Sequence, residues 1–115
     1  SIFIDNNGYV TEGSSSNIWI LNNENELITR NLDGKILSGI TRKSISLFAK
    51  RNKIKVVELK FTREELYGAK EVFLTSASSF VIPIIQIDNN KINKGLVGNI
   101  SLDLRKLYFD NFKNL

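Results

Sequence analysis

The stretch E-G-S-S-S-N places the carboxylate of Glu12 before a run of small hydroxyl residues that ends at Ser16 and Asn17. Residues 18–21 are all apolar, so this acid stands where a loop enters a buried strand. A solvated turn does not need a carboxylate at this position, whereas a site for a polar ligand can use one. Taken alone, however, a polar turn accounts for the stretch as well as a binding site does.

The stretch L-S-G-I-T-R, residues 37–42, places Gly39 immediately before a helical pattern. The first backbone N–H groups of a helix have no partner within the helix, and the helix dipole attracts negative charge there, so a phosphate can bind. Thr41 adds a hydroxyl group and Arg42 adds a cation. Simple capping of the helix by Ser38 or Thr41 is the competing interpretation.

The third polar stretch, T-S-A-S-S at residues 75–79, directly follows an apolar run. Ligands of α/β proteins favour the carboxyl ends of strands, so small hydroxyl residues there are candidates for ligand contacts. A plain serine-rich loop explains the same composition. Each of the three stretches is therefore ambiguous alone, and the hypothesis of a shared ligand depends on all three.

The hydrophobic pattern predicts the elements that carry these stretches. Thr62 and Glu65 match a capping box, and Pro83 favours an edge strand or a bulge. The expected strands are 1–4, 9–11, 17–21, 26–30, 54–61, 71–75 and 81–87, and the expected helices start at 39, run from 62 to about 68, and run from about 98 to 112. This order predicts one α/β domain with a mixed sheet and packed helices.

The composition excludes several classes of function. There is no cysteine and no histidine, so the chain has no disulfide, no thiolate site and no imidazole base. The net charge is +4, but the cations are scattered, which gives only a weak indication of nucleic-acid binding. No apolar run approaches the ~18 residues of a membrane span. We expect a cytoplasmic protein, and because the chain starts in strand-like sequence without a signal peptide, we expect it to be a piece of a longer one.

Together and in this order, the three stretches and the following V-I-P-I resemble the fold-type IV (class IV) pyridoxal-phosphate enzymes. That family contains D-amino-acid transaminases, branched-chain aminotransferases and aminodeoxychorismate lyases. The resemblance covers essentially the whole chain, and E-G-S-S-S-N is most similar to D-alanine transaminase. It implies that residues 1–115 are the larger C-terminal, cofactor-binding domain, whose mixed sheet forms a partial barrel with packed helices.

The resemblance also implies roles for individual residues toward pyridoxal 5′-phosphate. Glu12 would face the pyridine nitrogen and keep it protonated, Leu37 would pack on the ring, and the N–H groups of Ile40 and Thr41 would hold the phosphate. Residues 76–78 would add a further phosphate contact, and the serines after Glu12 would support the ring and Glu12 through hydrogen bonds. The candidate cofactor-binding residues are Glu12, Ser16, Asn17, Leu37, Gly39, Ile40, Thr41, Ser76, Ala77 and Ser78.

The chain departs from the family pattern at two positions and lacks one essential residue. Ala77 stands where the family usually has threonine, which removes a hydroxyl contact worth ~1.5–3 kcal/mol if it meets a charged phosphate. Phe80 stands where relatives often have glutamate. The Schiff-base lysine of the family lies roughly thirty residues before the Glu12 position, a spacing taken from the resemblance. No catalytic residue is therefore predicted on this chain, and the chain alone is expected to be inactive.

The resulting hypothesis is a dimeric aminotransferase that moves an amino group between D-alanine, or a related D-amino acid, and a 2-oxo acid. Within the same fold, a branched-chain L-amino-acid aminotransferase and aminodeoxychorismate lyase, which releases p-aminobenzoate, remain alternatives. From other classes, a non-catalytic module that binds a phosphorylated ligand and a basic nucleic-acid-binding domain also remain. No metal site and no membrane partner are expected.

Overall fold

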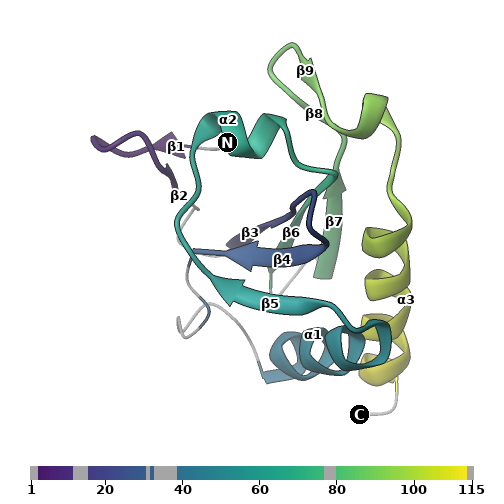
Figure 1. Cartoon of the computed structure of the whole chain (residues 1–115). Helices are drawn as coiled ribbons and strands as arrows, with labels where there is room; N and C mark the ends of the chain where they lie inside the picture. The colour runs from purple at the N-terminus through teal and green to yellow at the C-terminus, as the bar shows by residue number, and fades with distance from the viewer. Residues whose placement is uncertain (1–2, 12–15, 31, 33–38, 77–79, 114–115) are drawn as a thin grey trace.

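A mixed sheet in the order β5-β4-β3-β6-β7 forms the centre of the molecule (Figure 1). The computed structural model describes residues 3–11, 16–30, 32, 39–76 and 80–113. Within these residues the five strands are β3 (Ser16–Leu21), β4 (Glu26–Thr29), β5 (Lys55–Glu58), β6 (Glu71–Ser76) and β7 (Phe80–Ile84). The sheet in this part of the chain ends at β5 on one side and at β7 on the other.

The strand directions confirm the predicted mixed sheet. β3 pairs antiparallel with both β4 and β6, and β6 pairs antiparallel with β7. β4 and β5 are parallel, and helix α1 (Gly39–Asn52) lies between them in the sequence. A parallel pair requires such a long crossover, because a tight turn only reverses the chain direction.

The two faces of the sheet are covered by different elements (Figure 1). Alternate side chains of β3 point to opposite sides, so Trp19 joins one hydrophobic cluster and Ile18 the other. Helices α1 and α3 (Asn99–Lys113) cover the Trp19 face, where they contribute Ile45, Phe48, Leu104 and Tyr108. Helix α2 (Arg63–Tyr67) covers the Ile18 face together with Val10 and Phe61. Both faces are therefore buried, which explains why residues 18–21 are all apolar.

Two local predictions are confirmed in detail. The segment at residues 5–8 turns the chain between β1 (Phe3–Ile4) and β2 (Val10–Thr11), and Gly8 has a φ of +86°, which glycine adopts without strain. At the start of α2, the hydroxyl of Thr62 accepts the N–H of Glu65, and the carboxylate of Glu65 accepts the N–H of Thr62. This is the predicted capping box.

Two predicted strands are shorter than expected. The expected strand 81–87 breaks at Ile85, whose carbonyl accepts the N–H of Ile92 instead of extending the sheet. Beyond the break, β8 (Gln86–Ile87) pairs with β9 (Asn90–Lys91), and a 3₁₀ turn, η1 (Asn93–Gly95), follows. An apolar run does not reveal where a strand changes partner, so the sequence predicted one strand. Pro83 does lie in β7 at the sheet edge, as predicted.

The expected strand 54–61 is limited to β5 for a similar reason. Its neighbour β4 ends at Thr29, whose carbonyl accepts the N–H of Leu59. The carbonyl of Phe61 then accepts the N–H of Val10, so the chain leaves the sheet and joins β2 on the other face. The final helix, predicted at about 98–112, is confirmed as α3.

Candidate functional site

The first and third polar stretches meet across two neighbouring strands. In the antiparallel pairing of β3 with β6, Ser16 lies opposite Ser76 and Asn17 lies opposite Thr75. The start of β3 and the end of β6 thus lie side by side, at the same end of the sheet. The predicted convergence of these two stretches is present in the part that the structure describes.

A buried hydrogen bond lies near this end of the sheet, on the face that carries Trp19. Trp19 Nε1 donates to Thr75 Oγ1 over 2.9 Å, and the Trp19 ring stacks on Phe73 with 6.0 Å between ring centroids. Asn17 lies two residues before Trp19, so its side chain is on the same face, where it is 1% exposed. Asn17 Oδ1 accepts no hydrogen bond from the described residues, although Asn17 takes part in another contact. This end of the sheet therefore holds polar side chains that are buried away from bulk water.

The second stretch begins helix α1 at Gly39, as predicted, and α1 packs on this same face of the sheet. The first turn contains no acidic residue, and the side chain of Thr41 is only 2% exposed. The N–H groups of Ile40 and Thr41 belong to the first four of the helix, which have no partner within it. Amide donors and a hydroxyl, without a competing carboxylate, are a donor set that fits a phosphate group.

Arg42 was expected to supply a cation beside the bound anion, and the structure shows it in contact with the protein backbone. Its Nη1 donates to the backbone carbonyl of Leu32 over 2.7 Å. Arg42, Ile45 and Trp19 also line a hollow of about 230 Å³ beside the start of α1. The guanidinium thus holds the chain that approaches α1, a role that no pattern in the sequence indicated.

Four candidate residues, Glu12, Leu37, Ala77 and Ser78, lie outside the described residues. Ser16, Asn17, Thr41 and Ser76 are described with their side chains, and Gly39 and Ile40 with their backbone only. The roles assigned to these ten residues by resemblance remain predictions. Sequence reasoning missed Thr75 as a partner of Trp19; the available signal was that a buried indole N–H needs an acceptor.

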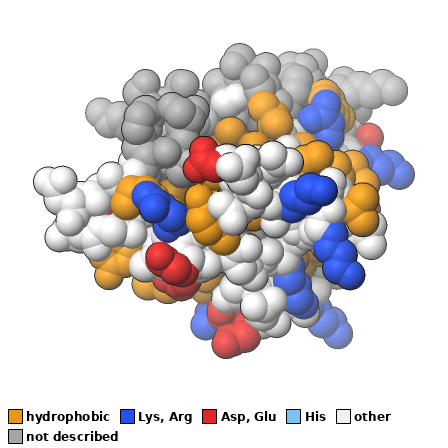
Figure 2. All heavy atoms as spheres, turned by 90° about the horizontal axis from the view of Figure 1, so that it is seen from above, with side chains coloured by type: hydrophobic (Ala, Val, Ile, Leu, Met, Phe, Trp, Pro, Cys, Tyr) orange, Lys and Arg blue, Asp and Glu red, His pale blue; other side chains and the backbone are white. Residues whose placement is uncertain are grey.

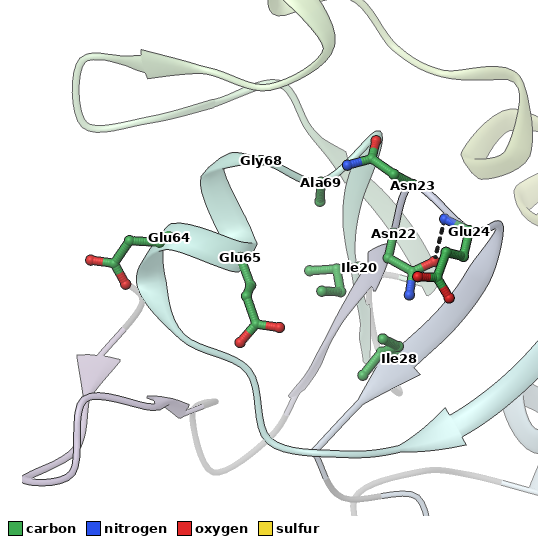
Figure 3. A pocket seen from close by; sticks show the side chains of 9 residues that line it. All are labelled: Ile20, Asn22, Asn23, Glu24, Ile28, Glu64, Glu65, Gly68 and Ala69. Carbon is green, nitrogen blue, oxygen red and sulfur yellow. Dashed lines mark hydrogen bonds between the residues drawn. The ribbon is translucent and has the colours of Figure 1, made fainter.

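A second hollow lies on the opposite face of the sheet, between α2 and the turn that joins β3 to β4 (Figure 3). It has a volume of about 460 Å³, an apolar floor that includes Ile20 and Ile28, and a rim with Glu24, Glu64 and Glu65. The carboxylate of Glu65 already serves the capping box. None of the predicted site residues lines this hollow, so it is separate from the candidate site.

The described residues contain no group of three or more acidic or other ligating side chains that could hold a metal ion, and none of their helices has the length and apolarity of a membrane span. On the face shown in Figure 2, most Lys and Arg side chains lie toward the right-hand side, with apolar, acidic and neutral side chains between them. This arrangement does not form the continuous basic stripe that is typical of a nucleic-acid surface.

Comparison with known proteins identifies the family. The family described as amino-transferase class IV matches residues 1–87, and the chain belongs to this family. The expected family is therefore confirmed, as is the mixed α/β fold. Membership implies pyridoxal 5′-phosphate as the cofactor, in agreement with the donor set at the start of α1.

The relatives carry two kinds of name. A probable branched-chain-amino-acid aminotransferase of Aquifex aeolicus (strain VF5) is 42% identical over 96% of this chain and 35% of its own length. A D-alanine aminotransferase of Bacillus licheniformis is 36% identical over 85% of the chain and 34% of its own length. The chain thus spans about a third of the length of these curated relatives.

A solved structure is similar over nearly the whole chain. It is a branched-chain amino acid aminotransferase from T.th., complexed with N-(5′-phosphopyridoxyl)-L-glutamate, and it matches with a TM-score of 0.77 and 35% identity. The match covers 95% of this chain and 36% of the solved one. The fold of the described residues is therefore that of one part of a class IV aminotransferase.

Proposed function

We propose that residues 1–115 are the C-terminal cofactor-binding domain of a longer, pyridoxal-phosphate-dependent aminotransferase. The observation that carries this proposal is the start of α1: an acid-free first turn with buried Thr41, on the sheet face that also holds Asn17. Family membership supports it, because the match over residues 1–87 includes all three polar stretches.

The residues of this chain would bind and orient the cofactor. The N–H groups of Ile40 and Thr41 would hold the phosphate, and residues 76–78 would add a second contact. Leu37 would pack against the ring, and the carboxylate of Glu12 would hold a proton on the ring nitrogen. When bound, the protonated cofactor would supply an electron sink for the substrate Cα. Ser16 and Asn17, at the start of β3, would support the Glu12 stretch.

The reacting lysine is proposed to lie upstream of this chain. None of the ten candidate residues is a lysine, and the chain has no histidine that could move a proton instead. We expect the chain alone to be inactive and the full-length protein to be active. A lysine roughly thirty residues before Glu12 is the specific requirement of this proposal.

Two amino-group donors are candidates. Branched-chain L-amino acids are favoured by the 42% identity to the Aquifex aeolicus protein with that name. D-alanine is favoured by the E-G-S-S-S-N stretch and by the relative from Bacillus licheniformis. In both cases the acceptor is a 2-oxo acid, and we propose that the enzyme is a cytoplasmic homodimer.

An activity assay on the full-length protein separates these candidates. The protein is incubated with pyridoxal phosphate and 2-oxoglutarate, with L-leucine or D-alanine as the donor, and the glutamate formed is measured. Turnover with one donor alone assigns the substrate class. Turnover with neither, combined with tight cofactor binding, supports the lyase or a non-catalytic phosphate-binding module. Failure to bind the cofactor contradicts the proposed function.

A matched pair of substitutions tests the phosphate site itself. Lys43→Glu and Lys50→Glu make the same charge change at exposed positions near the start and at the end of α1. Seven residues of helix separate them by about 10 Å, which is one Debye length at about 0.1 M salt. We expect Lys43→Glu to raise the Kd for pyridoxal phosphate about two- to fivefold more than Lys50→Glu does. Equal effects would place the phosphate elsewhere.

A further inference from the structure

Arg30 connects two strands that lead toward the candidate site. It directly follows β4, and its Nη1 donates to Asp5 Oδ2 over 3.1 Å and to the backbone carbonyl of Val10 over 3.2 Å. The side chains of Arg30 and Asp5 are 25% and 24% exposed. Both side chains are therefore partly buried, so water screens their contact somewhat less than it screens an ion pair on the open surface.

Asp5 is well placed to hold this guanidinium. Its Oδ1 accepts the N–H groups of Asn7 and Tyr9 inside the β1–β2 hairpin, so Oδ2 faces Arg30. The N–H of Tyr9 foremost, then that of Asn7 and the Arg30 guanidinium, hold the pKa of Asp5 below its ordinary value. The carboxylate is therefore charged at neutral pH, and the hairpin and the Arg30 contact stabilise each other.

The two strands that Arg30 joins precede the first and second polar stretches in the sequence. Val10 lies in β2, two residues before Glu12, and its N–H is already bound by the carbonyl of Phe61. Arg30 directly follows β4, and the sequence then continues to Leu37 and to the start of α1. One guanidinium thus ties the end of β4 to β2.

We propose that Arg30 is a positioning residue of the cofactor site: it ties β2, which precedes Glu12 in the sequence, to the end of β4, which precedes Leu37 and α1. This inference rests on the proposed function, because it assigns the two stretches to one bound cofactor. Arg30 acts through the backbone of Val10 and the carboxylate of Asp5. It is not proposed to touch the cofactor.

Three variants of the full-length protein test this role. Arg30→Met keeps most of the aliphatic stem and loses both hydrogen bonds, whereas Arg30→Lys retains a cation with three donors. Lys70→Met is the matched control. Lys70 Nζ donates to Asn25 Oδ1 over 2.9 Å at the opposite end of the β3–β4 hairpin, so this variant also removes a cationic contact. The readouts are the Kd for pyridoxal phosphate, titrated into the apoprotein, and the melting temperature of the apoprotein.

We expect Arg30→Met to raise the Kd about three- to tenfold, the equivalent of one or two partly exposed hydrogen bonds. Arg30→Lys and Lys70→Met should each stay within about twofold of the wild type. Because Arg30 also stabilises the hairpin through Asp5, Arg30→Met should lower the apoprotein melting temperature somewhat more than Lys70→Met does.

Two results would overturn the inference while the proposed function stands. One is an Arg30→Met protein that binds the cofactor as tightly as Lys70→Met does. The other is weaker binding that Arg30→Lys does not restore and that accompanies a much lower melting temperature, which indicates general destabilisation. A wild-type protein that fails to bind pyridoxal phosphate is a different outcome, since it overturns the proposed function and this inference together.

Discussion

The strongest structural prediction concerns Glu71, whose carboxylate lies at the start of α3. Oε1 accepts the N–H of Ser101 over 2.9 Å and its hydroxyl over 2.7 Å, and Oε2 accepts the N–H of Ile100 over 3.1 Å. Glu71 is 7% exposed. A carboxylate at this position satisfies amide groups that the helix leaves unpaired and interacts favourably with the helix dipole.

Replacing Glu71 by glutamine removes the charge and turns one acceptor into a donor. If the remaining oxygen keeps the bonds to Ser101, the new NH₂ group faces the N–H of Ile100, so that charge-assisted bond is lost. Such a bond contributes about 1.5–3 kcal/mol, and the weakened interaction with the helix dipole adds about 0.3–1 kcal/mol. We therefore expect Glu71→Gln to destabilise the start of α3 by roughly 2–4 kcal/mol, which is about a 30- to 700-fold change in its opening equilibrium.

Amide hydrogen exchange of the full-length protein measures this opening directly. The exchange rates of residues 100–104 are compared between the wild type, Glu71→Gln and the control Asp103→Asn, which removes an exposed carboxylate from the same helix. The control should change the rates by less than about threefold, the equivalent of a surface substitution of up to 0.5 kcal/mol. If Glu71→Gln exchanges as slowly as the control, the carboxylate does not hold the helix and the reasoning is wrong.

Gly98 provides an independent test of the same contact. A Cβ atom added there would lie 2.0 Å from Cδ of Glu71, so alanine must displace the carboxylate from α3. Gly98→Ala should therefore accelerate the same amides at least as much as Glu71→Gln does. In a Glu71→Ala background the substitution should have little further effect, because the two changes remove one interaction.

The remaining predictions concern local contacts in the full-length protein. Asp5→Asn should lower the melting temperature by a constant amount between pH 5 and 8. Because the folded-state pKa is below the ordinary 3.8, the difference should shrink as the pH falls through that lowered pKa. A difference that grows as the pH falls below 3.8 would contradict this. Thr75→Val leaves the indole N–H of Trp19 buried without its acceptor and should reduce the free energy of unfolding by about 1–3 kcal/mol in urea, whereas Thr75→Ser should have a smaller effect. Thr62→Ala removes the capping box with Glu65 and should destabilise α2 by about 1 kcal/mol, measured by amide exchange at Glu65; unchanged exchange would show that the cap is not needed.

Local patterns were sufficient for most of the secondary structure. The hairpin at residues 5–8, the capping box at Thr62 and the helices that begin at Gly39 and end near the C-terminus are each encoded by residues within a few positions of one another. The motif order also indicated the family, since the three polar stretches and their spacing were read directly from the sequence. These features depend on residues that are close together in the sequence, so a local pattern is enough to predict them.

Strand ends were less predictable, because they depend on partners elsewhere in the chain. The run from Val81 to Ile87 is uniformly apolar apart from Gln86, yet the carbonyl of Ile85 pairs with Ile92 and ends β7. β5 is short because β4 ends at Thr29 and the chain then turns toward Val10. The hydrophobic pattern indicates which residues are buried, but it does not indicate which neighbouring strand pairs with their backbone groups.

For the site, residue types and spacing were enough to nominate the start of α1 and the Glu12 and Ser76 stretches as ligand contacts. Only the folded chain showed that Ser16 lies opposite Ser76 and that Arg30 holds Val10. The same is true of Glu71, which binds an amide 30 positions away. The amides and carbonyls in such contacts are present in every residue, so nothing in the sequence marks them as partners; the packing of the two sheet faces brings them together.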